Sequence, residues 1–120
     1  MKTPTRRAGF TLVEIMIVVA IIGLLAAIAI PNFVKARATA QKNACIANLK
    51  QVDGAIQQWA LENKKQATDT YAFTDTTLLA YLKGSALPGG GVCPGGGTYT
   101  EGASVSATPT CSLSGSGHTL

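Results

Sequence analysis

The feature that most constrains this chain is an apolar run from Phe10 to Ile30, about 21 residues long. As an α-helix rising about 1.5 Å per residue, it would be about 31 Å long, enough to cross the hydrocarbon core of a bilayer. A short basic segment, residues 1–9, precedes the run, and its cations would hold that end of the helix in the cytoplasm: Lys2, Arg6 and Arg7. The sequence therefore predicts a single membrane-spanning helix with the remaining chain outside the cytoplasm.

One carboxylate, Glu14, interrupts the apolar run near its start. An ionised carboxylate in lipid costs about 2.5 kcal/mol or more, so its presence needs a reason. It could be a charge tolerated near the membrane interface. Alternatively, cleavage after Gly9 would create a new amino terminus at Phe10, and the Phe10 amine of a neighbouring subunit could pair with Glu14 away from water.

Residues 9–14, with the sequence GFTLVE behind a basic leader, resemble the cleavage and methylation signature of type IV prepilins and type II secretion pseudopilins. The resemblance covers about residues 2–40. It implies that a membrane-embedded prepilin peptidase cuts after Gly9 and N-methylates Phe10. Gly23 and Pro31 also match family positions, and in related filaments the segment that these two helix-breaking residues bracket is often extended.

An ordinary secretory signal is the competing interpretation of the N-terminus, because an A-x-A site, residues 27–29, follows a basic and then an apolar region. The length of the apolar run, its glutamate and the order of residues 9–14 favour the prepilin interpretation. The formal net charge of +4 gives no support for a nucleic-acid partner. Three of the ten cations lie in the leader, and no cluster of Lys and Arg interleaved with aromatic residues is present.

The expected fold class is α+β: a long N-terminal helix with a small pilin-like head that contains a short helix and a β-hairpin. The predicted segments are a leader at 1–9, a transmembrane and assembly helix at 10–31, an amphipathic continuation at 32–66 and a globular head at 67–120. The continuation carries a stripe of apolar residues spaced by four, three, four and three: Cys45, Leu49, Val52, Ile56 and Trp59.

Within the head, Asp75 is the expected N-cap of a short helix from Thr76 to Lys83, with Gly84 as a stop. The glycine-rich stretch 87–97 is expected to be irregular. Residues 98–100 and 109–113 are expected to form a short hairpin. The predicted core of the head lies over the helix stripe and consists of Tyr71, Phe73, Leu78, Leu79, Leu82, Leu87, Val92 and Tyr99.

No constellation of catalytic residues stands out, so we expect no enzyme activity and no cofactor. We also expect no metal, because Cys93, Cys111 and His118 match no common zinc spacing and lack a fourth ligand. A possible Cys93–Cys111 disulfide resembles the cysteine-bounded loop of many type IV pilins and would add about 3 kcal/mol to a marginal head. Cys45 is expected to be buried as a small hydrophobic residue, although a bridge from it stays open. The clustered acids that bind calcium in major pseudopilins are missing, with only Glu101 after Asp75.

The resemblance implies a structural subunit that leaves the inner membrane, packs through its N-terminal helix into a homo-oligomeric filament and presents its head outward in the periplasm or at the cell surface. Its implied partners are the prepilin peptidase and the platform protein and ATPase of a pilus or secretion machine. The alternative is a single-pass membrane-anchored binding module that does not polymerise. The sequence leaves open whether the filament is a pilus or a secretion or competence pseudopilus.

Overall fold

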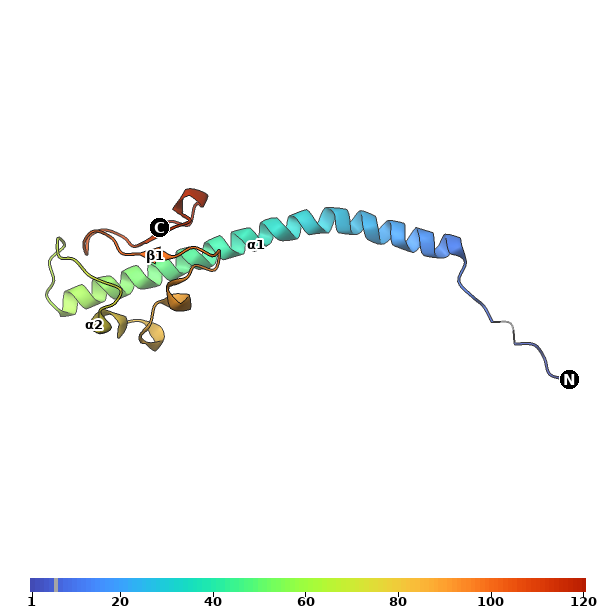
Figure 1. Ribbon diagram of the computed structural model, residues 1–120, viewed down its shortest axis with the longest axis horizontal. Helices are drawn as coiled ribbons and strands as arrows, with labels where there is room; N and C mark the ends of the chain where they lie inside the picture. The colour runs from blue at the N-terminus through green and yellow to red at the C-terminus, as the bar shows by residue number, and fades with distance from the viewer. Residues whose placement is uncertain (6) are drawn as a thin grey trace. The chain divides into compact units, whose positions relative to one another are not determined.

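The computed structural model describes residues 1–5 and 7–120; Arg6, one of the three predicted leader cations, lies outside the described residues. Two compact units are present, Met1–Ala36 and Arg37–Leu120. The longest element is helix α1, Leu12–Glu62, which begins in the first unit and ends in the second (Figure 1). The expected α+β class is confirmed, because α1 is accompanied by short helices and a two-stranded antiparallel sheet.

Helix α1 is shorter than expected at its C-terminal end. It stops at Glu62 rather than near Gln66, because Lys64 adopts a positive φ of 54°. The Lys65 amide then donates to the Ala60 carbonyl at 2.8 Å, and the Lys64 amide donates to the Leu61 carbonyl at 3.3 Å. These two bonds form a Schellman motif, which satisfies carbonyls that a helix end otherwise leaves unpaired.

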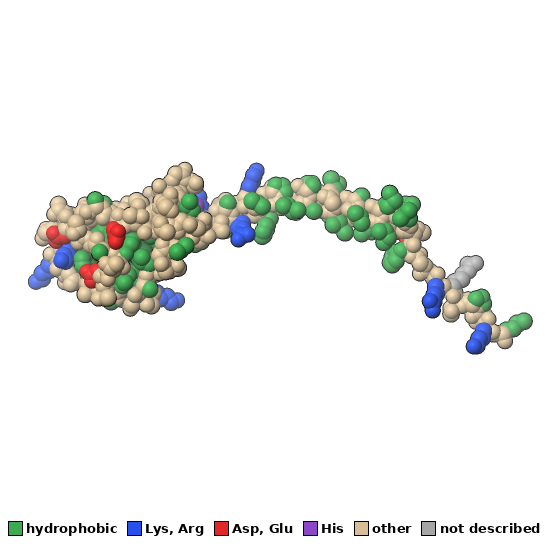
Figure 2. Space-filling model, in the orientation of Figure 1, with side chains coloured by type: hydrophobic (Ala, Val, Ile, Leu, Met, Phe, Trp, Pro, Cys, Tyr) green, Lys and Arg blue, Asp and Glu red, His purple; other side chains and the backbone are tan. Residues whose placement is uncertain are grey.

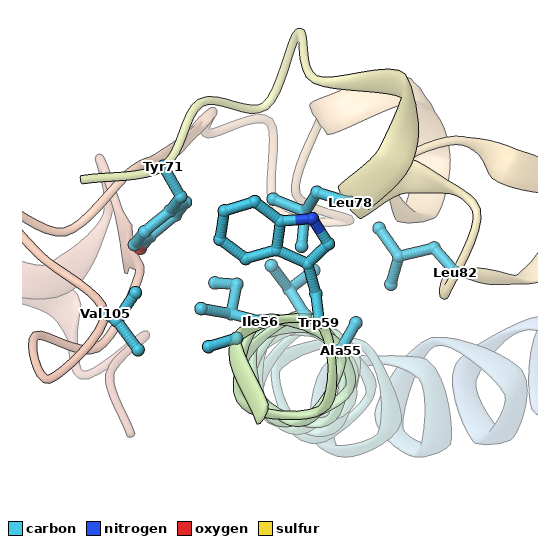
Figure 3. Packing of buried hydrophobic residues seen from close by; sticks show 9 residues of the cluster. Ala55, Ile56, Trp59, Tyr71, Leu78, Leu82 and Val105 are labelled. Atoms are coloured by element: carbon cyan, nitrogen blue, oxygen red, sulfur yellow. The ribbon is translucent and has the colours of Figure 1, made fainter. Parts of the chain in front are cut away.

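The predicted stripe on α1 is confirmed as the base of the head. Its members are all buried, and Ala55 and Ala60 join them. The largest cluster surrounds Trp59, whose indole lies between Tyr71 and Val105 on one side and Leu78 and Leu82 on the other (Figure 3). The indole nitrogen donates to the Thr77 hydroxyl at 2.9 Å, so the buried ring keeps its hydrogen bond.

The short helix α2 spans only Thr76–Leu79. Its predicted N-cap is confirmed, because a carboxylate oxygen of Asp75 accepts a hydrogen bond from the Thr77 amide at 2.8 Å. The helix does not reach Lys83 as expected; instead a 3-10 helix spans Lys83–Ser85. Further 3-10 helices span Pro88–Gly91 and Ser114–Ser116. The first of these lies within the glycine-rich stretch, which is irregular as expected apart from that single turn.

The predicted hairpin is confirmed as strand β1, Tyr99–Thr100, paired with strand β2, Thr110–Cys111. Tyr99 lies opposite Cys111, and the strands are antiparallel. The loop between them is held at Val105, whose amide donates to the Asp69 carbonyl at 2.9 Å and whose carbonyl accepts from the Gln57 side chain at 2.9 Å. Val105 is therefore a core residue that the predicted core lacked.

Most of the predicted core is confirmed, with one error. Tyr71, Leu78, Leu82 and Tyr99 are buried. Another three are partly buried against the core: Phe73, Leu79 and Leu87. Val92, however, is 49% exposed, so its assignment to the core was wrong. It forms an isolated bridge with Thr98, and its side chain faces outward while the next residue along, Cys93, faces inward.

Candidate functional site: an exposed apolar helix and a cysteine–histidine cluster

The N-terminal part of α1 exposes its apolar side chains. Among the described residues, one helix, α1, is long and apolar enough to span a membrane. No residue in the most apolar 18-residue window of α1 is buried within the chain. Figure 2 shows the hydrophobic side chains gathered on this part of the helix. Leu12 and Leu24, for example, are 77% and 66% exposed. A surface this apolar needs cover from lipid or from other protein chains.

Glu14 forms a reciprocal capping pair at the start of α1. The Thr11 amide donates to a carboxylate oxygen of Glu14 at 2.8 Å, and the Glu14 amide donates to the Thr11 hydroxyl at 3.2 Å. This is the capping box, in which Ser or Thr and a Glu three residues later satisfy two free amides at a helix N-terminus. This role was not predicted from the sequence, although the T-x-x-E spacing of residues 11–14 is its signal.

Gly9 and Gly23 have no packing reason to be glycine within this chain. A Cβ added at either position would meet nothing within 4 Å beyond its chain neighbours and the helix backbone. Packing within the described chain does not require glycine at position 9, which is compatible with recognition of Gly9 by another protein.

The two predicted helix breakers do not break the helix in this structure. Gly23 and Pro31 both lie inside α1, and the segment between them is helical. Proline removes one backbone donor, and the remaining hydrogen bonds of the helix can hold it together. In a lone chain, backbone groups at membrane depth must satisfy one another, and this favours the helical form of the segment.

In the unit Arg37–Leu120, four side chains from four separate segments meet at one point. We call this group the cysteine–histidine cluster: Cys45, Cys93, Cys111 and His118. Their candidate ligand atoms all lie within 4.8 Å of one another. Cys45 comes from α1, Cys111 from β2, Cys93 from the glycine-rich stretch and His118 from the segment after the last 3-10 helix. All four residues are buried.

No bond joins Cys93 to Cys111 in this structure, in which all three cysteines are free, and the disulfide between them stays a prediction. The glycine-rich stretch does fold back, as expected, and brings the two sulfurs close together. Cys45 and His118 lie in the same cluster as these two sulfurs. The expectation that Cys45 is buried is confirmed, but its surroundings are polar sulfur and imidazole groups as well as apolar side chains.

The surroundings of the cluster shift the pKa values of Cys45 and Cys93 in opposite directions. Burial, reinforced by the neighbouring thiols, raises the pKa of Cys45 to about 12. Burial alone would also raise the pKa of Cys93, but hydrogen bonds from Cys45, the Gly95 amide and His118 outweigh it and lower the pKa to about 7. Cys93 is therefore the thiol whose ionised form this site favours.

Comparisons with known proteins agree with the resemblance seen in residues 9–14. The family model for the prokaryotic N-terminal methylation motif matches residues 4–30. The type IV major pilin protein PilA of Myxococcus xanthus is 62% identical over 45 residues, which are 38% of this chain and 20% of that protein.

Two further relatives extend the similarity into the head. The type IV major fimbrial protein FimA of Dichelobacter nodosus is 43% identical over 76 residues, covering 63% of this chain and 49% of FimA. The type II secretion system core protein G of Escherichia coli is 30% identical over 88 residues, covering 73% of this chain and 57% of that protein. The chain thus spans less than two thirds of the length of each relative. No solved structure matches it.

Proposed function

We propose that this chain is a structural subunit of a type IV pilus-like filament, either a pilin or a type II secretion pseudopilin, assembled through the N-terminal part of α1. The observation that carries the proposal is the combination of a methylation motif at residues 4–30 with an apolar helix that buries none of its most apolar window in its own chain. Such a helix is suited first to lipid and then to the interior of a helical assembly of identical subunits.

The proposed processing is cleavage after Gly9 and N-methylation of Phe10 by a prepilin peptidase. Residues 1–9 form the leader in this proposal, residues 10–31 the transmembrane and assembly segment, residues 32–66 the amphipathic continuation and residues 67–120 the head. The subunit would cross the inner membrane with the leader in the cytoplasm before an assembly platform and its ATPase move it into a periplasmic or cell-surface filament.

Glu14 is the proposed contact for the Phe10 amine of a neighbouring subunit. A carboxylate has about four acceptor positions, so the hydrogen bond from the Thr11 amide leaves Glu14 able to accept from an incoming amine. Because the pair would form away from water, a neighbour in the wrong register would leave a buried charge unpaired, at a cost of several kcal/mol.

The segment between Gly23 and Pro31 is proposed to give up helical hydrogen bonds in the filament. It is helical in the single chain, where no neighbouring helix shields its backbone. Packing among other subunits would remove that requirement, and the two breakers lower the cost of extension. A filament map with unbroken helix through Ala26 would contradict this part of the proposal.

Electron microscopy of sheared surface fractions, combined with mass spectrometry of the subunit, tests the proposed function. We expect filaments built of a chain that begins with N-methylated Phe10. A chain that is found only as an unpolymerised membrane protein would favour the alternative function, a single-pass anchored binding module.

A further inference from the structure

We propose that the head binds one structural zinc ion through four protein ligands: Cys45, Cys93, Cys111 and His118. This inference concerns the unit Arg37–Leu120, the head together with the part of α1 that it covers, and does not depend on the filament proposal. It begins from the fact that four buried side chains of the types that zinc prefers converge on one point from four separate segments.

The distances within the cluster fit a tetrahedral site. Zinc binds cysteine sulfur at about 2.3 Å and histidine nitrogen at about 2.0–2.1 Å, which places tetrahedral ligand atoms about 3.5–3.8 Å apart. In this head, Cys93 Sγ lies 3.3 Å from His118 Nδ1, and all four ligand atoms lie within 4.8 Å of one another. Reducing the widest of these separations to about 3.8 Å would take a change of about 1 Å or less.

The chemistry of the ligand set selects zinc and a structural role. Three thiolates and one imidazole are the donor set of closed, four-coordinate zinc sites. Binding Zn²⁺ displaces the three thiol protons to solvent, so the complex carries a net charge of −1. With four protein ligands and burial on all sides, no position remains for a water or a substrate. The ion would therefore link α1 to the C-terminal half of the head and would not perform catalysis.

The backbone around Cys93 supports a thiolate there. The Gly95 amide donates to Cys93 Sγ at 3.3 Å, and the Gly96 amide donates to the Cys93 carbonyl at 2.8 Å, closing a tight turn over the sulfur. An amide that donates to sulfur stabilises its ionised form, the form that binds metal.

Glycine is needed at two positions beside the cluster. A Cβ on Gly95 would lie 2.9 Å from the His118 ring, and a Cβ on Gly97 would lie 2.9 Å from Cys111 Sγ. The backbone therefore approaches the ligands more closely than any other residue allows. This close approach accounts for glycines that the sequence alone presents only as turn residues.

A cation lies beside the histidine segment. The Lys42 ammonium would be 2.7 Å from a Cβ built on Gly117, which immediately precedes His118. Lys42 also precedes Cys45 by three residues on α1, so both side chains leave the same side of the helix. A positive charge in this position would offset the negative charge of a zinc centre with three thiolates.

A disulfide is the competing use of the same sulfurs. Extracytoplasmic compartments oxidise thiols, so two of the three cysteines could bond to each other. Such a bond would leave the third thiol and His118 buried with no shared role, whichever pair formed. A zinc ion would bind all four groups, and for this reason zinc accounts for the cluster better than a disulfide does.

The primary test is the zinc content of the full-length chain, purified in detergent with a phosphine reductant and supplied with zinc alone. We expect about one zinc per chain, with loss in Cys111→Ser and in His118→Ala. The matched controls are Thr110→Ser and Thr119→Ala, exposed neighbours of these two ligands, which should keep full zinc content.

Wild-type measurements keep the test decisive where a ligand variant fails to fold. X-ray absorption at the zinc edge should give about three sulfurs near 2.3 Å and one nitrogen near 2.0 Å. Alkylation should label the three thiols only after zinc is chelated. Zinc at background in protein with three free thiols would overturn the proposal. So would a disulfide among the three cysteines, found by non-reducing peptide mapping of protein isolated from cells without reductant.

Discussion

Glu14→Gln separates the charge of this residue from its role as a helix cap. Glutamine can still accept the hydrogen bond that the Thr11 amide now donates at 2.8 Å, because a capping box works with Glu or Gln. It cannot form an ion pair with the Phe10 amine of a neighbouring subunit. Thr11→Ala is the matched opposite, since it removes the hydroxyl cap at 3.2 Å and keeps the carboxylate.

Glu14→Gln and Thr11→Ala are expected to weaken subunit addition by clearly different amounts. Removing one partner of a buried ion pair costs about 3–5 kcal/mol, whereas losing an N-cap costs about 1 kcal/mol. At 1.4 kcal/mol for each factor of ten, Glu14→Gln should weaken subunit addition roughly 140- to 4,000-fold and Thr11→Ala about fivefold. Glu14→Gln should insert into the membrane at least as well as wild type, because a charge in lipid has been removed.

The assay compares the amount of subunit in sheared filaments with the amount left in the membrane, for wild type and both variants. Mass spectrometry of each N-terminus checks that processing is unaffected. Normal filament yield from Glu14→Gln would refute the pairing argument. Equal loss in both variants would show instead that the cap, and not the charge, is what assembly requires.

Three further changes test the leader and the head. Gly9→Val should leave the unprocessed chain in the membrane by mass spectrometry; a chain that still begins at Phe10 would contradict cleavage that depends on this glycine. Trp59→Ala should lower the free energy of unfolding by about 3–5 kcal/mol in urea, because the indole fills the centre of the core. Gly102→Ala should destabilise the head in the same assay, since its Cβ would overlap the Ala107 carbonyl oxygen, whereas Gly115→Ala meets nothing within 4 Å and should change little.

The helical elements follow closely from local sequence, because the signals that form them lie within a few residues of one another. The apolar run predicts the N-terminal half of α1, and the spacing of apolar residues from Cys45 to Trp59 predicts its buried face. Asp75 predicts the start of α2 for the same local reason. The end of α1 was missed because a Schellman motif on a non-glycine residue, Lys64, leaves almost no trace in sequence.

The head core was only partly predictable. Val105 stands alone in a polar loop, and long-range hydrogen bonds to Asp69 and Gln57 are what hold it in the core. Val92 is as apolar as Val105 yet lies outside, because strand-like alternation turns its neighbour Cys93 inward instead. Apolar character alone could not assign either residue, since the loop path decides which side chain the core receives.

What the sequence by itself determined is a membrane-length apolar helix behind a short basic segment, a methylation motif, and an amphipathic continuation whose apolar stripe packs against the rest of the chain. Only the tertiary structure joined Cys45 to Cys93, Cys111 and His118. Sequence spacing reveals a metal site when its ligands lie close together in a local turn. In this chain the ligands lie on a helix, a glycine-rich loop, a strand and a C-terminal segment, so only the packing of the hairpin against α1 brings them within reach of a single ion.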